Sequence, residues 1–309
     1  IIKNTEFMKK KLLTQETGKQ KILLFGSNGM LGHKILQNLP LDFLIIGTIR
    51  KKNKKLNTYK LIKNINIKNF HKIEKLIKNI NPTYVINCSG VIKQKLEKKK
   101  YLDLKVINYS FPLFLDKLSS KYQFKHIHFS TDCVFDGKKG NYKEKSKTNA
   151  KDEYGKYKAL AEKKIKNNTL IIRTSIIGHE INGRKLSLLE WFLNTKKNLS
   201  GYYFAFFSGL TTLEISKILN KIIINDKFYK GLYNISSRKI SKYNLLQKIN
   251  KIYNLNKIIQ KNKKFKIDRS LNSKKFVKKF KIYVSSWDKQ ILDMYKDYKK
   301  NKKIYSNEI

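Results

Sequence analysis

Tyr154 and Lys158 lie four residues apart and follow an apolar, strand-like run that ends at Ser130 and Thr131. Residues four apart share one face of a helix, and a buried strand delivers hydroxyl groups at its carboxyl end into a crevice. A phenol, an ammonium and a hydroxyl would then converge. This set can pass a proton to a carbonyl oxygen while a cofactor supplies a hydride. Because a free phenol has a pKa of about 10, working near neutrality requires a downward shift of roughly 3 units, and the lysine cation is its natural source.

The Tyr-x-x-x-Lys spacing is weak evidence by itself, because the composition predicts about four such pairs by chance. The same spacing occurs elsewhere, for instance at Tyr59 and Lys63. Only Tyr154 both follows a strand ending in Ser-Thr and continues into a plausible helix. The sequence context therefore selects Tyr154, Lys158 and Thr131 as the catalytic candidates.

A glycine-rich turn, Gly26-Ser-Asn-Gly-Met-Leu-Gly32, follows the apolar run 21–25 and precedes a helical run at 33–39. The order strand, glycine turn, helix is typical of a phosphate cradle, because glycines allow a tight turn and a close approach of backbone to phosphate. The composition predicts this glycine triple only about 0.03 times by chance. The residues that we expect to bind a dinucleotide here are Gly26, Asn28, Gly29, Met30, Leu31 and Gly32.

Basic residues follow the second apolar run, 43–48. An acidic residue at this strand end binds the ribose 2′-hydroxyl of NAD, whereas a basic one accommodates the 2′-phosphate of NADP. Here the position is Thr48, with Arg50 close behind and Lys51 next to it. The sequence predicts NADPH as the cofactor, with Arg50 on the phosphate and NADH as the alternative.

Strand-like and helical runs alternate through the first half of the chain, which predicts an α/β fold with a Rossmann-type, doubly wound parallel sheet. The expected strands are 21–25, 43–48, a short one closed by Asn66 and Ile67, 83–88, 126–130 and 169–174. Helices are expected at 70–80 and at about 96–122, the latter broken or kinked near Pro112. The small residues Ser89 and Gly90 would let backbone pass along the dinucleotide. His126 and His128 alternate along a strand, and we interpret them as packing residues with no metal site.

After residue 175 the pattern becomes less regular and indicates a smaller α/β lobe that closes over the crevice beside Tyr154. We expect residues 21–175 to form the dinucleotide-binding domain and 176–309 mostly a substrate-binding lobe, with segments that return to the sheet. The expected elements are helices at 187–198, 211–224, from Ser241 to 253 and at 268–280, an extended run at 202–207 and a strand at 231–236, while 258–267 is weakly patterned. Residues 1–20 are expected to be an N-terminal extension, and the sequence leaves open whether it is ordered or disordered.

The chain is strongly basic, with a formal net charge of +47. Such a charge attracts polyanions, but only five basic residues are arginine and the lysines are spread along the whole chain. Neither a zinc spacing nor a nucleic-acid-binding motif accompanies them. We therefore interpret the lysines as a composition bias on solvated faces that steers an anionic substrate, and expect no nucleic-acid partner.

Two cysteines, Cys88 and Cys133, are too few for a disulfide framework, and each lies in an apolar run. Reduced thiols in the cytoplasm are the simplest interpretation. No apolar run approaches the roughly 20 residues that span a bilayer, and 1–20 lacks a signal-peptide core. We expect a cytoplasmic protein without a membrane partner.

Taken together, these motifs resemble an extended short-chain dehydrogenase/reductase, and within that superfamily the dTDP-4-dehydrorhamnose reductase family. The segments that carry the resemblance are Gly26–Gly32, Asn81–Cys88, Ser130–Gly137, Gly140–Glu144 and Tyr154–Lys158. The resemblance implies that Tyr154 is the proton donor, that Lys158 orients the nicotinamide ribose and lowers the Tyr154 pKa, and that Thr131 polarises a sugar ketone. It implies NADPH or NADH as cofactor and a nucleotide-linked 4-keto-6-deoxyhexose, used for surface polysaccharide, as substrate.

The same resemblance extends the expected binding set. The further cofactor positions are Asn66, Ile67, Cys88, Ser89, Gly90, Asn108, Ser130, Tyr154 and Lys158. Thr131 and Asp132 are expected to contact substrate, and the planar guanidinium groups of Arg173 and Arg269 suit its pyrophosphate, with a structural ion pair as the alternative for each. The chain departs from the family at Cys133, where a tyrosine is usual, and at Asn66, where an aspartate often touches adenine.

Two other functions stay open, and a third is disfavoured. An epimerase on the same scaffold would return its cofactor to the starting redox state, whereas a dehydratase is disfavoured because Cys133 stands where that class has a glutamate. A regulatory subunit of methionine adenosyltransferase resembles the same family and binds NADP without turnover, although such a relative has no need to keep Thr131, Tyr154 and Lys158. The sequence leaves open the identity of the sugar, its nucleotide, the stereochemistry of the reduction and whether the chain forms a homodimer.

Overall fold

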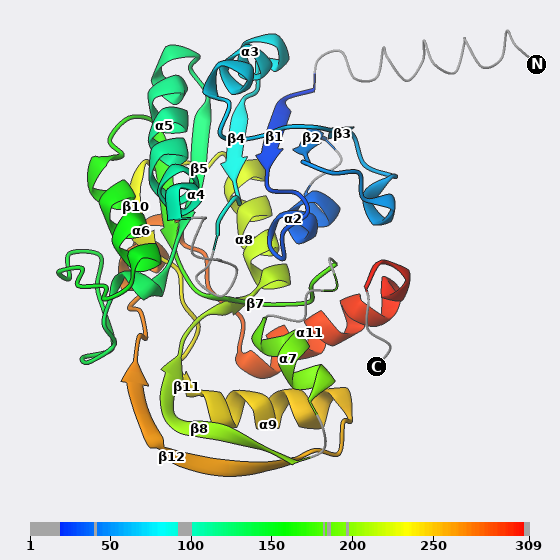
Figure 1. Ribbon diagram of the computed structural model, residues 1–309, viewed down its shortest axis with the longest axis vertical. Coiled ribbons are helices and arrows are strands. Elements are labelled where there is room, and N and C mark those ends of the chain that lie inside the picture. The colour runs from blue at the N-terminus through cyan, green and yellow to red at the C-terminus, as the bar shows by residue number, and fades with distance from the viewer. Residues whose placement is uncertain are drawn as a thin grey trace, which may run out of the picture.

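The computed structural model describes residues 19–39, 42–91, 101–181, 183, 187–195 and 198–305 (Figure 1). Its central feature is a seven-stranded sheet in the order β10-β6-β5-β4-β1-β2-β3, in which every pair of neighbours is parallel. The strands are β1 (Lys21–Phe25), β2 (Leu44–Thr48), β3 (Leu61–Ile62), β4 (Tyr84–Asn87), β5 (Lys125–Ser130), β6 (Thr169–Arg173) and β10 (Gly231–Asn234). The predicted doubly wound α/β fold is confirmed.

Strand order reverses between β1 and β4, since β2 and β3 lie on one side of β1 and β4 to β6 on the other. In open parallel sheets a crevice forms at the carboxyl ends of the strands at such a switch point. The glycine turn follows β1, residues 88–90 follow β4, and Thr131 follows β5. The topology therefore brings the predicted cofactor and catalytic segments to one edge of the sheet.

Alternating side chains of β1 enter two different cores, because successive residues of a strand point to opposite faces. Ile22 and Leu24 pack in the core that holds α2 and α8, whereas Leu23 and Phe25 pack in the core of α3 and α5. The helices are α2 (Gly32–Asn38), α3 (Phe70–Ile80), α4 (Tyr101–Lys105), α5 (Phe111–Lys121), α6 (Glu153–Lys164) and α8 (Thr212–Ile224). Helices thus cover both faces of the sheet (Figure 1).

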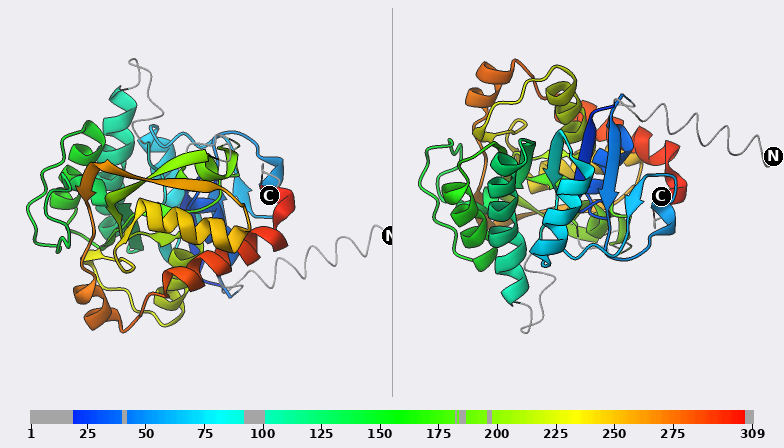
Figure 2. Two further views of the ribbon diagram at one scale, coloured as in Figure 1. Left: turned by 90° about the horizontal axis from the view of Figure 1, so that it is seen from below. Right: turned by 90° about the horizontal axis from the view of Figure 1, so that it is seen from above.

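A smaller lobe is built on a three-stranded sheet in the order β11-β8-β12, with its own apolar core. Figure 2 shows α9 lying along β8 and β12 in the view from below. The elements of this half are β7 (Ile176–Ile177), α7 (Leu188–Asn194), β8 (Asn198–Phe207), β9 (Leu210–Thr211), β11 (Ile240–Ser241), α9 (Lys242–Tyr253), β12 (Ile258–Asp268), α10 (Lys274–Phe280) and α11 (Trp287–Lys300). Strand β10 and helix α8 return to the main sheet and its core, while the division at residue 175 stays a prediction.

Several predicted boundaries are wrong. The third strand is Leu61–Ile62, and Asn66 with Ile67 lies in the turn before α3. Of the predicted helix 96–122, residues 96–100 lie outside the described part, and a π-helix (Val106–Ser110) joins α4 to α5. Pro112 is the second residue of α5, directly after the π-helix, and the helix continues past it to Lys121.

The second half of the chain holds two elements that the pattern did not reveal. The weakly patterned run 258–267 is β12, which pairs in parallel with β8, and residues 287–300 form α11. The predicted helix at 268–280 begins only at Lys274. Most side chains of β12 are exposed lysines and other polar groups, so alternation of apolar residues is lost there.

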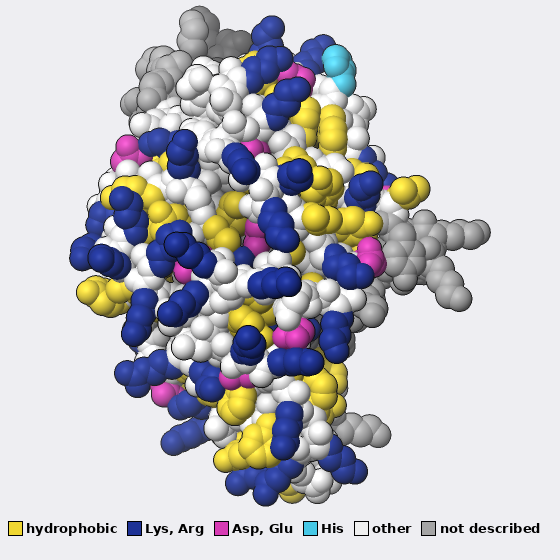
Figure 3. All heavy atoms as spheres, turned by 90° about the vertical axis from the view of Figure 1, so that its left-hand side faces the viewer, with side chains coloured by type: hydrophobic (Ala, Val, Ile, Leu, Met, Phe, Trp, Pro, Cys, Tyr) yellow, Lys and Arg dark blue, Asp and Glu magenta, His cyan; other side chains and the backbone are white. Residues whose placement is uncertain are grey.

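Basic side chains are spread over the face shown in Figure 3, with acidic and apolar groups between them. This distribution fits lysines on solvated surfaces. In the described residues no helix is long and apolar enough to cross a membrane.

Candidate functional site

The glycine turn packs directly against the backbone that follows β4. Gly26 has a φ of +85°, and a side chain there would lie 2.9 Å from the backbone of Cys88 and Ser89. A Cβ at Gly32 would lie 2.1 Å from the Gly26 carbonyl oxygen. Both positions therefore need glycine, and the result is a bare backbone surface at the switch point.

Asn28 ties this turn to the loop after β2. Its Nδ2 donates to the Lys51 carbonyl at 3.5 Å, and the Asn53 amide donates to its Oδ1 at 3.2 Å. Arg50 is exposed on the same loop. The structure thus places the predicted 2′-phosphate residue beside the predicted phosphate cradle.

The remaining predicted cofactor residues fall around the same edge. Met30 is partly exposed, whereas the Leu31 side chain lies in the core, so Leu31 offers only backbone to a ligand. Asn66 is exposed and Ile67 is half-buried against the α3 core. The bare glycine turn, the short segment after β4 and the basic loop after β2 fit a dinucleotide.

Asn108 serves a different purpose from the predicted one. It is fully buried, and its carboxamide accepts from the Val91 N–H at 3.4 Å and donates to the Val91 carbonyl at 3.0 Å. Both polar groups are thus occupied by backbone. We therefore correct its role from cofactor contact to support of the segment after β4, which carries Ser89 and Gly90.

Thr131 and Tyr154 are brought together at the carboxyl end of β5. The Thr131 hydroxyl caps a short 3₁₀ helix (Asp132–Val134) by accepting from the Cys133 N–H at 3.1 Å, and it lies within hydrogen-bond reach of the Tyr154 phenol. It also donates to the Asp132 carboxylate at 3.3 Å. The predicted meeting of a hydroxyl and a phenol is present in the structure.

Helix α6 is held close to this turn by its own first residues. The Asp152 carboxylate caps the helix by accepting from the Gly155 N–H at 2.8 Å. A Cβ at Gly155 would lie 2.2 Å from the Cys133 carbonyl, so only glycine permits this approach. Gly155 therefore sets the position of its neighbour Tyr154.

Lys158 lies one turn further along α6 and points beneath the edge of the sheet. Its buried ammonium donates to the Phe129 carbonyl at 2.9 Å and lies near His128 and Cys88. Burial lowers the pKa of Lys158 to about 8, although Glu162 and Cys88 oppose this. Burial likewise keeps the His128 pKa well below its usual value and raises that of Cys88.

The predicted lowering of the Tyr154 pKa is wrong for this structure. Burial raises the Tyr154 pKa, and the nearby Cys133 and Asp132 add to the effect, while the Thr131 hydroxyl opposes it. The reason is that removing a phenolate from water costs more than the neighbouring groups return. Tyr154 therefore holds its proton at neutral pH.

Arg173 and Ser130 belong to a buried network outside the crevice, contrary to the prediction. The Arg173 guanidinium, 1% exposed, donates to both Glu162 oxygens at 2.9 and 2.5 Å and to Asn234 Oδ1 at 3.2 Å. The Ser130 hydroxyl donates to the same glutamate at 2.5 Å. Because the network uses these donors, we withdraw Arg173 from the residues expected to bind pyrophosphate and Ser130 from those expected to bind the cofactor. Arg173 instead forms a structural ion pair, which was the alternative.

Arg269 does reach the crevice. Its Nη1 donates to the Cys133 sulfur at 3.5 Å, and its buried Nε has no hydrogen-bond partner within the described chain. Sequence reasoning missed a second cation, Lys242, the first residue of α9, which lies close to Asp132 and Cys133. Only the N-cap signal at Ser241 could have pointed to that position.

The two histidines of β5 have the predicted packing role. Both are fully buried, with His126 hydrogen-bonded to Thr169 and His128 to Asn87. No group of three or more candidate metal ligands occurs in the described residues. Cys88 and Cys133 are both free thiols.

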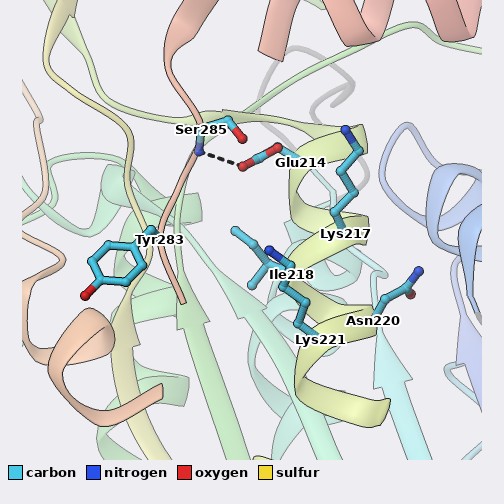
Figure 4. Close-up of a pocket in the computed structure, with 7 residues that line it drawn as sticks. All are labelled: Glu214, Lys217, Ile218, Asn220, Lys221, Tyr283 and Ser285. Carbon is cyan, nitrogen blue, oxygen red and sulfur yellow. Dashed lines mark hydrogen bonds between the residues drawn. The ribbon is translucent and has the colours of Figure 1, made fainter. Parts of the chain in front are cut away.

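Two hollows lie away from the site. Figure 4 shows one of about 290 Å³ between α8 and the segment at Tyr283 and Ser285, where Glu214 accepts from the Ser285 N–H at 2.8 Å. A second, of about 850 Å³, adjoins it and is lined by residues from α10 and from loops including 236–238 and 284–286. Neither contains a predicted catalytic or cofactor residue.

Comparison with known proteins gives one family and many related folds. The family model described as the RmlD substrate binding domain matches residues 20–300. A dTDP-4-dehydrorhamnose reductase from Bacillus anthracis, in complex with NADP, is 20% identical with a TM-score of 0.75, covering 90% of this chain and 98% of its own. A hypothetical dTDP-4-dehydrorhamnose reductase from Sulfolobus tokodaii is 23% identical with a TM-score of 0.71, covering 84% and 94%.

Related folds also carry other activities. A dTDP-glucose 4,6-dehydratase from Bacillus anthracis, in complex with NAD, is 19% identical with a TM-score of 0.72, covering 93% of this chain and 98% of its own. At these identities the likeness establishes the fold. No curated protein matches the chain by sequence.

Proposed function

Since the chain belongs to the RmlD substrate binding domain family, whose members are NAD(P)-dependent oxidoreductases, we propose that it reduces the ketone of a nucleotide-diphospho-4-keto-6-deoxysugar with NADPH. The observation that carries the proposal is the meeting of Thr131 with Tyr154 beside the bare glycine turn. The names of the similar structures favour a dTDP-linked sugar as the substrate, and we propose surface polysaccharide as the use of its product. The free thiols Cys88 and Cys133 support a cytoplasmic location.

The dinucleotide, when bound, supplies the hydride. We assign its pyrophosphate to the backbone of the glycine turn, its 2′-phosphate to Arg50 and its further contacts to Cys88, Ser89 and Gly90. Asn66 and Ile67 remain in the proposed set near the adenine, on the loop that precedes α3. These assignments follow the order of segments along the carboxyl edge of the sheet.

Tyr154 acts as the general acid in this mechanism. Its raised pKa keeps the phenol protonated at neutral pH, which is the form that can give a proton to an alkoxide forming on the sugar. In the structure the Thr131 hydroxyl donates its one proton to Asp132, and we propose that it turns to donate to the same sugar oxygen when substrate binds. Lys158, one turn further along α6 with its ammonium on the Phe129 carbonyl, is assigned to the nicotinamide ribose.

The direct assay follows NADPH oxidation at 340 nm with a panel of dTDP-, UDP- and GDP-4-keto-6-deoxysugars made in place by a dehydratase. We expect stoichiometric oxidation that depends on one nucleotide series. NADPH binding without oxidation across the panel would contradict the proposal and favour an epimerase or a regulatory subunit.

Replacing Arg50 with alanine is expected to weaken NADPH binding by about tenfold or more and to leave NADH binding unchanged. Hydrogen bonds between charged partners contribute about 1.5–3 kcal/mol, and NADH lacks the 2′-phosphate. Fluorescence titration with both cofactors measures this. The matched control is Lys63→Ala, which removes an exposed basic side chain after β3. An unchanged NADPH/NADH ratio in Arg50→Ala would remove the assignment.

Binding of NADPH is expected to weaken as the pH rises through about 8. The folded-state pKa of Lys158 is lowered to about 8, so the ammonium is charged below that pH and neutral above it. An anionic dinucleotide therefore loses an attractive charge on the alkaline side. The Kd for NADPH as a function of pH checks this, and Lys158→Met should lack the inflection. The same inflection in Lys158→Met would assign it to another group.

A further inference from the structure

Two cations of the smaller lobe meet at Cys133, the position where this chain departs from its family. Arg269 follows β12 and donates from Nη1 to the Cys133 sulfur at 3.5 Å. Lys242 begins α9, whose N-cap Ser241 accepts from the Asn244 N–H at 3.0 Å. Its ammonium lies 4.0 Å from the centre of the Phe207 ring and close to Asp132.

Lys242 and Arg269 are both half-buried, and their charged groups are left short of partners. Among the described residues neither forms an ion pair with a carboxylate, and the Nε of Arg269 is buried without a hydrogen bond. The neighbouring Lys239, by contrast, is exposed and pairs with Asp268 at 3.1 Å. Burial lowers the pKa of Lys242 to about 8, against the opposing effect of Asp132 and Cys133.

The buried, unbonded Nε of Arg269 costs free energy in the protein alone. An ammonium carries three donors and a guanidinium five, and removing such groups from water is costly unless acceptors replace the water. Most other lysines of this chain avoid the cost by lying in solvent, as Lys264 does on β12. The unpaired charges at Cys133 therefore indicate a site whose acceptors arrive with a ligand.

We propose that Lys242 and Arg269 form an anion subsite of the substrate cleft, which binds phosphate or carboxylate oxygens of the sugar nucleotide beside Asp132. The inference rests on the proposed function, because it takes Thr131 and Tyr154 as the place of the reacting sugar. The planar guanidinium offers paired donors to such oxygens, and the ammonium adds a point charge. Cys133 is smaller than the tyrosine that is usual at this position in the family. Lys242 is thus a substrate-binding residue supplied by the smaller lobe.

The test measures ligand binding by calorimetry in the presence of NADP⁺, for the full chain and for Lys242→Met. Methionine keeps an apolar stem on Phe207 and removes the charge. The ligands are dTDP and UDP, their phosphate-free counterparts thymidine and uridine, and UDP-glucuronate with UDP-glucose. Lys264→Met is the matched control, since it makes the same charge change at an exposed position, and Lys242→Arg is expected to restore most of the affinity.

If Lys242→Met binds dTDP or UDP about tenfold or more weakly than the unaltered chain, with nucleoside binding unchanged, the subsite is supported and its ligand group is phosphate. Unchanged diphosphate binding with a loss confined to UDP-glucuronate would support it with carboxylate as the group. Equal affinities of Lys242→Met and the unaltered chain for every ligand, or no binding of any of them to the unaltered chain, would overturn it. Calorimetry measures binding without turnover, so its result does not depend on the reductase activity. If ligand binding depends on Lys242 but the chain reduces no sugar, the subsite is supported and the proposed function fails.

Discussion

Tyr154→Phe is expected to lower kcat by about 10²- to 10⁴-fold, the contribution usual for a positioned general acid. The change removes one oxygen from a partly exposed ring, so folding and NADPH binding should persist. Steady-state kinetics with the sugar identified by the panel measures the effect. KM should change far less than kcat, because the phenol gives its proton only as charge develops on the sugar oxygen.

Tyr157→Phe provides the matched control, since it makes the same change on the same helix, three residues away. Its kcat is expected to stay within a factor of about two of the unaltered chain. Near-normal turnover in Tyr154→Phe would refute the mechanism. An equal loss in both variants would indicate damage to α6 in place of a lost proton donor.

Arg173→Met is expected to destabilise the fold by about 3–5 kcal/mol, the usual cost of leaving a buried charge without its partner. Glu162, with a side chain 3% exposed, would lose both bonds to the guanidinium, and the cost is large against a typical stability of about 5–15 kcal/mol. Denaturant unfolding of the variants measures this free energy. Replacing Glu162 by methionine as well should recover much of the loss, because an apolar pair leaves no charge unpaired.

Lys248→Met is the matched control for that experiment. Its pair with Asp288 is largely exposed, at 37% and 66%, so its removal should cost less than about 1 kcal/mol. A small effect of Arg173→Met on stability together with a large rise in KM would contradict the assignment of Arg173 to the buried network and return it to the substrate.

The local signals of the first half of the chain sufficed to predict its architecture. The alternation of strands and helices, the glycine turn after β1 and the end of α3 before Pro82 are all set by residues close in sequence. Glycine, proline and regularly spaced apolar residues act on the nearby backbone, so their positions in the sequence are enough to predict turns, helix ends and strands. Strand β12 shows the limit, since it is a lysine-rich strand whose pairing with β8 decides its conformation.

Site residues were predictable where backbone topology determines them. Thr131 and Tyr154 meet because β5 ends at the crevice and Gly155 lets α6 approach it. The partners of Arg173, Ser130 and Asn108 depend on which side chains face each other across the folded core, and no spacing in the sequence encodes that choice. Lys242 escaped notice for the same reason, since it is one lysine among many until α9 places it at the crevice.

The most direct test of the central claim is the transfer of deuterium from NADPH labelled at C4 of the nicotinamide, on each face in turn, to the sugar product. One labelled cofactor should yield a product that is one mass unit heavier, with the label at C4 of the sugar and one cofactor oxidised for each product formed. Conversion of the sugar without label, and with the cofactor returned to its starting redox state, would contradict the reductase mechanism and identify an epimerase.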